Sequence, residues 1–253
     1  MSILRLPHRW IAIVALASVF VSANVQADMV TLNVNAAQSS LTIGGNAFTL
    51  NYVQQNAGSL VANWGGTIKA DLTAGVFTFS PGSAITAIVN PSGPYTTAPN
   101  VIGSEAGNYG VTASGVVPGF GPQTINGVYK NLILDITAGT AQNGAATVAT
   151  MNFSAGALDY GIAPAAVTGT SSLANVSGVN ASASLVSWNG TTLTIPVSFL
   201  TTGSNRNESW NGTIVATIVA VPEPSSIALM SLVGIVGLSY ASVRSRRVMR
   251  LAN

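Results

Sequence analysis

Short runs of alternating apolar and polar residues fill the middle of this chain and limit what it can fold into. They include MVTLNV from Met29, SLTI from Ser40, AFTLNYV from Ala47, GVFTFS from Gly75 and LILDI from Leu132. Turn-forming residues recur at short intervals, and no segment keeps a helical period over about eleven residues. The pattern predicts an all-β fold, an antiparallel β-sandwich or a jelly-roll-like arrangement.

Charge and cysteine content exclude several functional classes. Only 6% of the 253 residues are charged, and the chain has no cysteine, which excludes disulfides, thiolate catalysis and cysteine-ligated metals. Residues 28–221 carry three basic and six acidic side chains, a formal charge of −3, although the whole chain has +2. Because this region has no basic face to bind phosphates, we expect no nucleic-acid partner.

The first 27 residues have the three parts of a secretory signal peptide. Two arginines precede an apolar run over residues 10–21, and Val25-Gln26-Ala27 supplies small or neutral recognition positions. We expect a signal helix that a signal peptidase cleaves after Ala27, which leaves Asp28 as the new N-terminus. The alternative is an uncleaved anchor helix, which the short apolar run and the cleavage pattern disfavour.

The other end combines a rigid triplet, an apolar run and a basic tail. Pro222-Glu223-Pro224 precedes residues 227–243, a run of 17 residues without charge. At about 1.5 Å per residue, a helix of this length spans roughly 25 Å, slightly short of a hydrocarbon core of about 30 Å. Arginine side chains can reach back to the headgroups, and the positive-inside rule keeps them cytoplasmic. These are Arg244, Arg246, Arg247 and Arg250.

We therefore expect a transmembrane helix over residues 227–243, with residues 28–221 outside and a basic tail, residues 244–253, in the cytoplasm. A buried C-terminal core helix is the alternative, but four closely spaced arginines are costly to bury. The prolines fix φ and remove backbone donors, so the helix cannot continue past Pro224. A short extended strip then projects above the membrane, as a protease requires.

This order of triplet, apolar run and arginine cluster resembles the PEP-CTERM sorting signal. The resemblance covers residues 222–253, and a signal peptide accompanies it at the other end of the chain. It implies an exosortase, a transpeptidase-like membrane enzyme, that acts near Pro222-Glu223-Pro224. It also implies a Gram-negative exporter, a transient anchor in the inner membrane, and delivery to the cell surface or an exopolysaccharide matrix. Because unrelated domains carry the same tail, it says nothing about residues 28–221.

A Trp-x-Gly-Thr pattern occurs three times, at Trp64, Trp188 and Trp210. The Gly-Gly and Asn-Gly pairs inside it favour the positive φ angles of a type I′ turn, so each copy predicts a hairpin. The flat rings suit apolar sugar faces, which makes the three tryptophans candidate contacts for a polysaccharide. Alternatively, each ring packs across its own hairpin, and we favour this because hairpin chemistry already explains the shared position.

The second copy also predicts a register. A two-residue turn pairs Trp188 with Thr191 and Val186 with Leu193, which places the apolar side chains of the hairpin on one face. Pro196 lies in the following strand, so we expect this strand at an edge of the sheet. The strand after the third copy, TIVATIVAV, is apolar on both faces and is expected to be central.

A Gly/Pro-rich region holds six of the eleven prolines, between residues 81 and 122. It also contains Tyr95, Tyr109 and Phe120, which are candidates for ligand contact because long loops often carry binding residues. The alternative, which we favour, is that this region only connects strands.

The chain from residue 28 to 221 contains no histidine and no cysteine, since the single histidine lies in the signal peptide. Serine–histidine and cysteine–histidine nucleophiles and histidine-ligated zinc are therefore excluded. We expect no cofactor and no metal, although a calcium site assembled from distant loops stays open. A glycosidase-like carboxylate pair also stays open. The candidate carboxylates are Asp71, Glu105, Asp135, Asp159 and Glu208.

Three functional hypotheses follow. We favour an exported, non-enzymatic surface or extracellular-matrix protein, structural or adhesive, in an exopolysaccharide or biofilm context. The alternative is a carbohydrate-binding module that uses the tryptophans or the loop aromatics. The third is a carboxylate-dependent glycan-cleaving enzyme, which requires two carboxylates about 5–10 Å apart in a cleft.

Overall fold

The computed structural model describes residues 28–97, 105–142, 149–174, 176–179, 186–203 and 205–219. The expected signal helix with Ala27, the sorting triplet, the expected transmembrane helix and the basic tail lie outside these residues. The described residues form strands and no helix, which confirms the all-β prediction. No described helix meets the length and hydropathy that a membrane span requires.

The described strands form one hydrogen-bonded, antiparallel network. They are β1 (Asp28–Val34), β2 (Ser40–Ala47), β3 (Leu50–Asn51), β4 (Val53–Gln54), β5 (Val61–Thr73), β6 (Val76–Phe79), β7 (Ala84–Ala87), β8 (Tyr109–Val117), β9 (Gly121–Ala138), β10 (Thr140–Gln142), β11 (Thr150–Ala163), β12 (Val167–Ser172), β13 (Ser177–Val179), β14 (Ser187–Trp188), β15 (Thr192–Gly203) and β16 (Arg206–Ile218). The main path runs β12-β11-β9-β7-β5-β1-β16-β15-β14, and the other strands branch from it.

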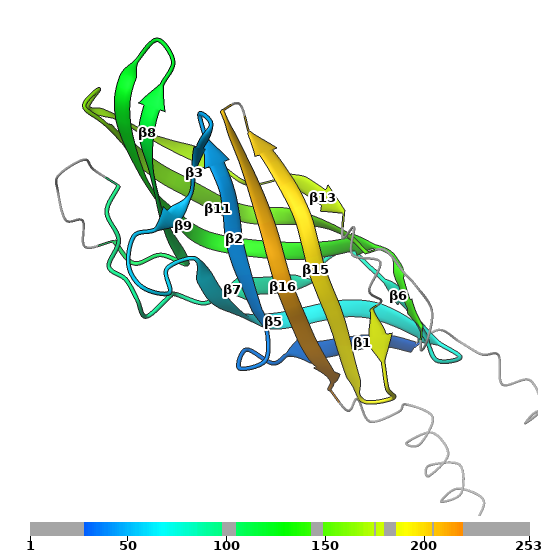
Figure 1. Cartoon of the computed structure of the whole chain (residues 1–253). Coiled ribbons are helices and arrows are strands. Elements are labelled where there is room, and N and C mark those ends of the chain that lie inside the picture. Colours follow the sequence, from blue (N-terminus) through cyan, green and yellow to red (C-terminus); the bar gives the residue numbers. More distant parts are fainter. Residues whose placement is uncertain are drawn as a thin grey trace, which may run out of the picture. The chain divides into compact units, whose positions relative to one another are not determined.

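The network folds over itself around a shared core. β2 pairs along β16 and also with the start of β5, and this contact closes part of the path. β2, β16 and β15 lie side by side in Figure 1, and β9 and β11 cross behind them. Phe199 of β15 and Trp210 of β16 meet Phe153 of β11 between these two groups. A smaller apolar cluster around Leu50, Ala113 and Ile125 continues the interior toward the β8–β9 hairpin.

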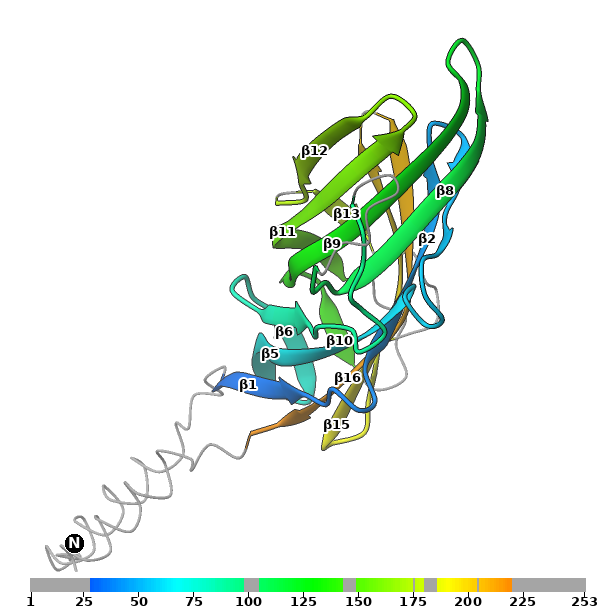
Figure 2. The same cartoon turned by 90° about the vertical axis from the view of Figure 1, so that its left-hand side faces the viewer.

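The β8–β9 hairpin reaches beyond the rest of the described strands (Figures 1 and 2). Its turn is closed by a hydrogen bond from the N–H of Phe120 to the carbonyl of Val117, at 3.0 Å. Gly119 adopts φ +82° there, as the third residue of a type II turn with Pro118 before it does. The C-terminal end of β16 lies at the opposite end of the same group of strands.

Only one of the three Trp-x-Gly-Thr copies forms a hairpin. Trp188 ends β14 and turns into β15, but Trp64 lies inside β5 and Trp210 lies inside β16. The prediction of three turns is therefore wrong at two positions. Gly66 and Gly212 lie inside long strands, where a Cβ would come within 2.0 Å of a carbonyl oxygen of a neighbouring strand, and neither reverses the chain.

The hairpin at Trp188 has a different register from the expected one. Trp188 lies opposite Leu193, not Thr191, so the turn moves by one residue. The Asn189 side chain accepts a hydrogen bond from the N–H of Thr191 at 3.1 Å, an Asx-turn that begins the reversal. Because the pairing shifts by two residues, the faces are unchanged, and Val186, Trp188 and Leu193 are all buried.

The expected central position of the strand after the third copy is confirmed, whereas the expected edge position of the strand that contains Pro196 is not. β16 lies between β15 on one side and β1 and β2 on the other, so it is central. β15, which contains Pro196, is not the last strand of the path, because β14 lies beyond it and pairs with Leu193 and Thr194. The strand after Gly212 is not buried on both faces: Ile214 and Ala216 are buried, whereas the residues between and after them are partly accessible.

Candidate functional site

The three tryptophans are interior residues. Trp64 and Trp210 are fully buried, and Trp188 is 7% exposed. The indole of Trp64 donates to the hydroxyl of Tyr109 at 2.8 Å, and that hydroxyl donates to a carbonyl of β2 at 3.0 Å. The indole of Trp210 donates to the hydroxyl of Thr201 at 2.9 Å. All three rings are buried, and the N–H groups of Trp64 and Trp210 are already bonded, so the structure agrees with interior packing and not with a sugar platform.

The rings that pack against Trp188 and Trp210 do not come only from the hairpin of each tryptophan. Trp188 meets Phe77 of β6 edge-on, with ring centroids 4.6 Å apart. Trp210 meets Tyr109 of β8 and Phe153 of β11, at 5.6 and 5.0 Å. Each tryptophan therefore joins strands that are distant in the sequence.

The Gly/Pro-rich region contains β7 and β8 and is less of a loop than its composition suggests. Tyr95 and Tyr109 are buried, and only Phe120 among its three candidate aromatics is exposed, at 76%. The hydroxyl of Tyr95 lies 2.8 Å from that of Ser92, within the same segment. Of these three residues, Phe120 alone is placed to contact another molecule.

Two of the five candidate carboxylates bond to nearby backbone or hydroxyl groups. Asp135 accepts the N–H of Gly82 on both oxygens, at 3.1 and 3.2 Å. Asp71 accepts a hydrogen bond from the hydroxyl of Ser80 at 3.3 Å. These contacts connect Asp71 and Asp135 to the ends of the segment between β6 and β7.

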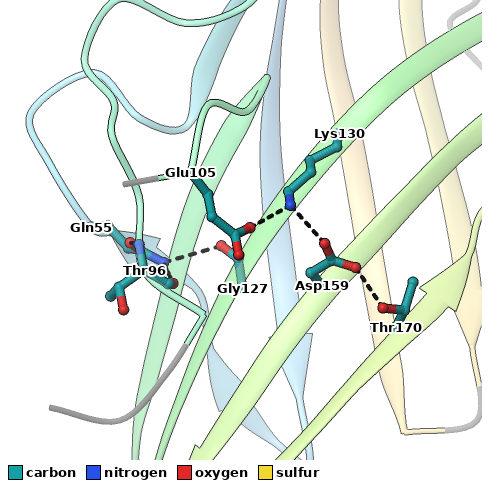
Figure 3. Close-up of polar contacts among 7 residues, drawn as sticks. All are labelled: Gln55, Thr96, Glu105, Gly127, Lys130, Asp159 and Thr170. Atoms are coloured by element: carbon teal, nitrogen blue, oxygen red, sulfur yellow. Dashed lines mark hydrogen bonds and ion pairs between the residues drawn. The ribbon is translucent and has the colours of Figure 1, made fainter. Parts of the chain in front are cut away.

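Two other candidate carboxylates, Glu105 and Asp159, form ion pairs with the same lysine (Figure 3). Lys130 of β9 forms ion pairs with Glu105, just before β8, and with Asp159 of β11, where Nζ lies 2.7 Å from Oδ2. The other oxygen of Asp159 accepts a hydrogen bond from the hydroxyl of Thr170 on β12, at 2.7 Å. One ammonium group therefore connects the segment before β8 to the β9–β11–β12 edge.

Gln55 makes a second set of contacts with the segment before β8, through hydrogen bonds to Thr96 (Figure 3). Its amide nitrogen donates to the carbonyls of Thr96 and Gly127, at 2.9 and 3.1 Å, and its oxygen accepts the N–H of Thr96 at 2.9 Å. Glu105 also forms a backbone bridge with Tyr95. These contacts have a structural role: they hold the described parts of residues 90–108 against β8 and β9.

The charges at Lys130 stabilise each other's ionised forms. The hydrogen bond from Lys130, followed by that from Thr170, holds the pKa of Asp159 below its ordinary value. Burial lowers the pKa of Lys130, but hydrogen bonds to Asp159 and Glu105 more than offset this, so the pKa is raised. A general acid needs a raised carboxyl pKa, and Asp159 has the opposite shift.

Replacing Asp159 with asparagine is expected to lower the free energy of unfolding at pH 7 by about 0.5–1 kcal/mol, because the ion pair is partly exposed. The folded-state pKa of Asp159 is lowered, so its contribution is present above about pH 4 and disappears as the pH falls through the folded-state pKa. Urea denaturation at pH 7 and near pH 2 tests this. Asp71→Asn, which removes no described ion pair, is the matched control. An equal loss from Asp159→Asn at both pH values would contradict the assignment.

A cavity of about 380 Å³ lies on the other side of β11 from Asp159, and its lining is mostly apolar. It is formed by the ends of β2, β8, β9, β11, β12 and the start of β16. The lining residues are Ala47, Phe48, Tyr52, Val111, Ile125, Gly127, Leu158, Tyr160, Ile162, Val167, Thr170, Ser171, Asn205 and Arg206. None of them carries a carboxylate, so no described candidate for glycan cleavage faces this cavity.

A buried ion pair stands beside the cavity. Arg206 contributes its Nε at 2.6 Å from Oε1 of Glu208, whose side chain is only 1% exposed. Glu208 also accepts hydrogen bonds from Tyr129 at 3.1 Å and from Thr201 at 2.7 Å. Burial raises the pKa of the neighbouring Tyr52 to about 12, which keeps its hydroxyl protonated at neutral pH.

No sequence pattern singled out the two basic residues at these places. Lys130 and Arg206 are two of only three cations between residues 28 and 221. Their scarcity was a usable signal, since a rare cation in an apolar domain tends to pair with a carboxylate. No sequence pattern indicated the cavity, which needs six strands to converge. Among the described residues, no group of three or more acidic, histidine or cysteine side chains is arranged to hold a metal.

Comparison with known protein families identifies a sorting motif near the C-terminal end of the sequence. A family model described as the PEP-CTERM protein-sorting motif matches residues 220–247, which include Pro222, Glu223 and Pro224. The match confirms the resemblance and is consistent with an exosortase substrate. No curated protein and no solved structure matches the chain significantly. The motif implies export and membrane-anchored processing before release.

Proposed function

We propose that this chain is a non-enzymatic protein of the cell surface or extracellular matrix, with a structural or adhesive role in an exopolysaccharide context. The observation that carries the proposal is the sorting motif at residues 220–247, directly after β16 ends at Ile218. The short interval leaves no room for a further domain between the strands and the motif.

The bounds of the folded region support processing at both ends. β1 begins at Asp28, the residue that signal peptidase would expose, and it pairs along β5 from that residue onward. Removal of residues 1–27 and cleavage near Pro222 would therefore leave every described strand intact. A sandwich-like domain released in this way keeps its whole core.

The contacts of the acidic side chains support a role without catalysis. Glu105 and Asp159 share Lys130, and Glu208 is enclosed by Arg206 and two hydroxyl groups. Each is used to hold strands or segments together. A glycosidase needs one carboxyl group that stays protonated beside one that does not.

The β8–β9 hairpin supports an adhesive role. Its tip exposes Phe120 at 76% and Val116 at 69%, at the end of the strands opposite the end of β16. Exposed apolar side chains at the tip of a projecting hairpin are placed to contact a partner rather than the core. We assign the tip as the contact with matrix polymer or a neighbouring surface.

Replacing Pro222, Glu223 and Pro224 together with alanine is expected to abolish most delivery of the protein to the surface, because the processing enzyme loses its recognition strip. Cell fractionation and surface labelling of whole cells that express the full chain measure the effect. Pro118→Ala, in the hairpin turn, is the control for loss of a proline elsewhere. Surface delivery at the wild-type level in the triple variant would refute the sorting proposal.

A further inference from the structure

We propose that the cavity beside Arg206 binds a small organic carboxylate with a compact apolar body. The site does not depend on the sorting motif or on the adhesive role. It rests on three features of the cavity: apolar walls, a guanidinium group with unused donors, and a floor that is kept open by a glycine.

The walls suit an apolar body more than a sugar. Aliphatic side chains of β2, β8, β9, β11 and β12 line the space, among them Val111, Ile125, Leu158 and Ile162. Ligand pockets typically enclose a few hundred Å³ and are lined by apolar groups with a few polar ones that fix orientation. The volume of about 380 Å³ lies in that range. A sugar would leave most of its hydroxyl groups without partners against these walls.

Arg206 supplies the polar group that fixes the head of the ligand. Its Nε is taken by Glu208, and among the described residues no acceptor is found for its two terminal nitrogens. Arg206 lines the cavity and Glu208 does not, so the residue of the ion pair that reaches the cavity is the cation. A planar guanidinium matches a carboxylate with two parallel N–H···O bonds, and such charge-assisted bonds are about twice as strong as neutral ones.

The remaining polar groups favour an acceptor over a donor. The hydroxyl oxygens of Tyr52 and Tyr129 lie 3.4 Å apart, and Tyr129 donates its single proton to Glu208 at 3.1 Å. Tyr160 and Ser171 add further hydroxyl groups to the lining, and no lining side chain is a carboxylate. An ammonium ligand would therefore find no carboxylate in the lining to pair with.

A glycine keeps the space open. A Cβ at Gly127 would lie 2.8 Å from Cδ1 of Leu158 and 3.1 Å from Cγ2 of Val111, both of which line the cavity. Any side chain there would occupy the volume or push these two walls outward. The chain thus has no side chain at the position where a larger residue would close the site.

Isothermal titration calorimetry with the full chain in lipid nanodiscs tests the proposal, with empty nanodiscs as the blank. The probes share one body and differ in the head group: 4-tert-butylbenzoate, 4-tert-butylbenzyl alcohol and 4-tert-butylbenzylamine. We expect the carboxylate to bind about tenfold more tightly than the alcohol, and the amine to bind most weakly. Equal affinity for the three probes, or no binding of the carboxylate, would overturn the proposal.

Two variants locate the binding. Val167, at the rim, is 46% exposed, so Val167→Trp covers the opening without disturbing the core, and Val116→Trp on the hairpin is the matched control. Arg206→Lys keeps a charge for Glu208 but loses the planar fork, so it should reduce the preference for the carboxylate to about threefold or less. Circular dichroism verifies folding. Undiminished binding in Val167→Trp, an unchanged preference in Arg206→Lys, or methyl glucoside binding as tightly as the carboxylate would overturn the assignment.

Discussion

Replacing Gly66 with alanine is expected to unfold the described strands under conditions in which Gly75→Ala leaves them folded. Both glycines have positive φ, +115° and +80°, so both variants pay about 1–2 kcal/mol for the unfavourable backbone angle. A Cβ at Gly66 would also lie 2.0 Å from the carbonyl oxygen of Ala84 in β7. At Gly75 there is nothing within 4 Å.

The extra cost at Gly66 comes from its place between two strands. It pairs with Val34 of β1 on one side and with Ile85 of β7 on the other. A new methyl group can fit only if β7 moves away, which breaks the path between β5 and β9. We expect Gly66→Ala to lower the free energy of unfolding by more than about 4 kcal/mol, a loss typical of severe core changes. Urea denaturation followed by tryptophan fluorescence measures both variants, and equal losses would contradict the close contact.

Trp210→Ala is expected to lower the free energy of unfolding by about 3–5 kcal/mol. The indole is fully buried and touches rings from four strands, and its N–H satisfies the hydroxyl of Thr201, which in turn donates to Glu208. The variant therefore leaves a cavity and weakens the hydrogen bonds around a buried carboxylate. Trp210→Phe should cost less, because it keeps most of the packing.

The neighbouring surface provides the control for Trp210. Leu200 lies next to Phe199 on β15 but faces outward and is 68% exposed, so Leu200→Ala should change the stability by no more than about 0.5 kcal/mol. Thermal and urea denaturation of the full chain compare the variants. A loss below about 1 kcal/mol for Trp210→Ala would show that this ring does not join the two groups of strands.

The fold class could be predicted because alternation is a local property. Runs such as MVTLNV and GVFTFS become strands whose buried side chains are apolar. AFTLNYV is an exception, because a turn at Phe48 and Thr49 separates the end of β2 from β3. The division of faces around Trp188 was also correct, although the register was not. Faces depend only on whether residues are an odd or even number apart, whereas the register depends on which side chain begins the turn.

The candidate site was much less predictable. Glycine with a positive φ occurs both in tight turns and inside long strands, so Trp64-Gly65-Gly66-Thr67 looked like a hairpin. The carbonyl of Ala84 approaches Gly66 from another strand, so the residues around Gly66 in the sequence give no sign of this contact. Likewise, Tyr95 and Tyr109 appeared to be loop aromatics because the strands that cover them are distant in the chain.

By itself, the sequence determined the strand-rich class, the exclusion of thiol and imidazole chemistry, and the sorting segment, because composition, alternation and a contiguous motif are written in neighbouring residues. Only the tertiary structure decided that the tryptophans are interior, that Lys130 joins Glu105 to Asp159, and that Arg206 faces a cavity. Each of these depends on side chains from strands that pair far apart in the sequence. Packing and ion pairing are short-range forces in space, and the fold alone determines which residues come within their range.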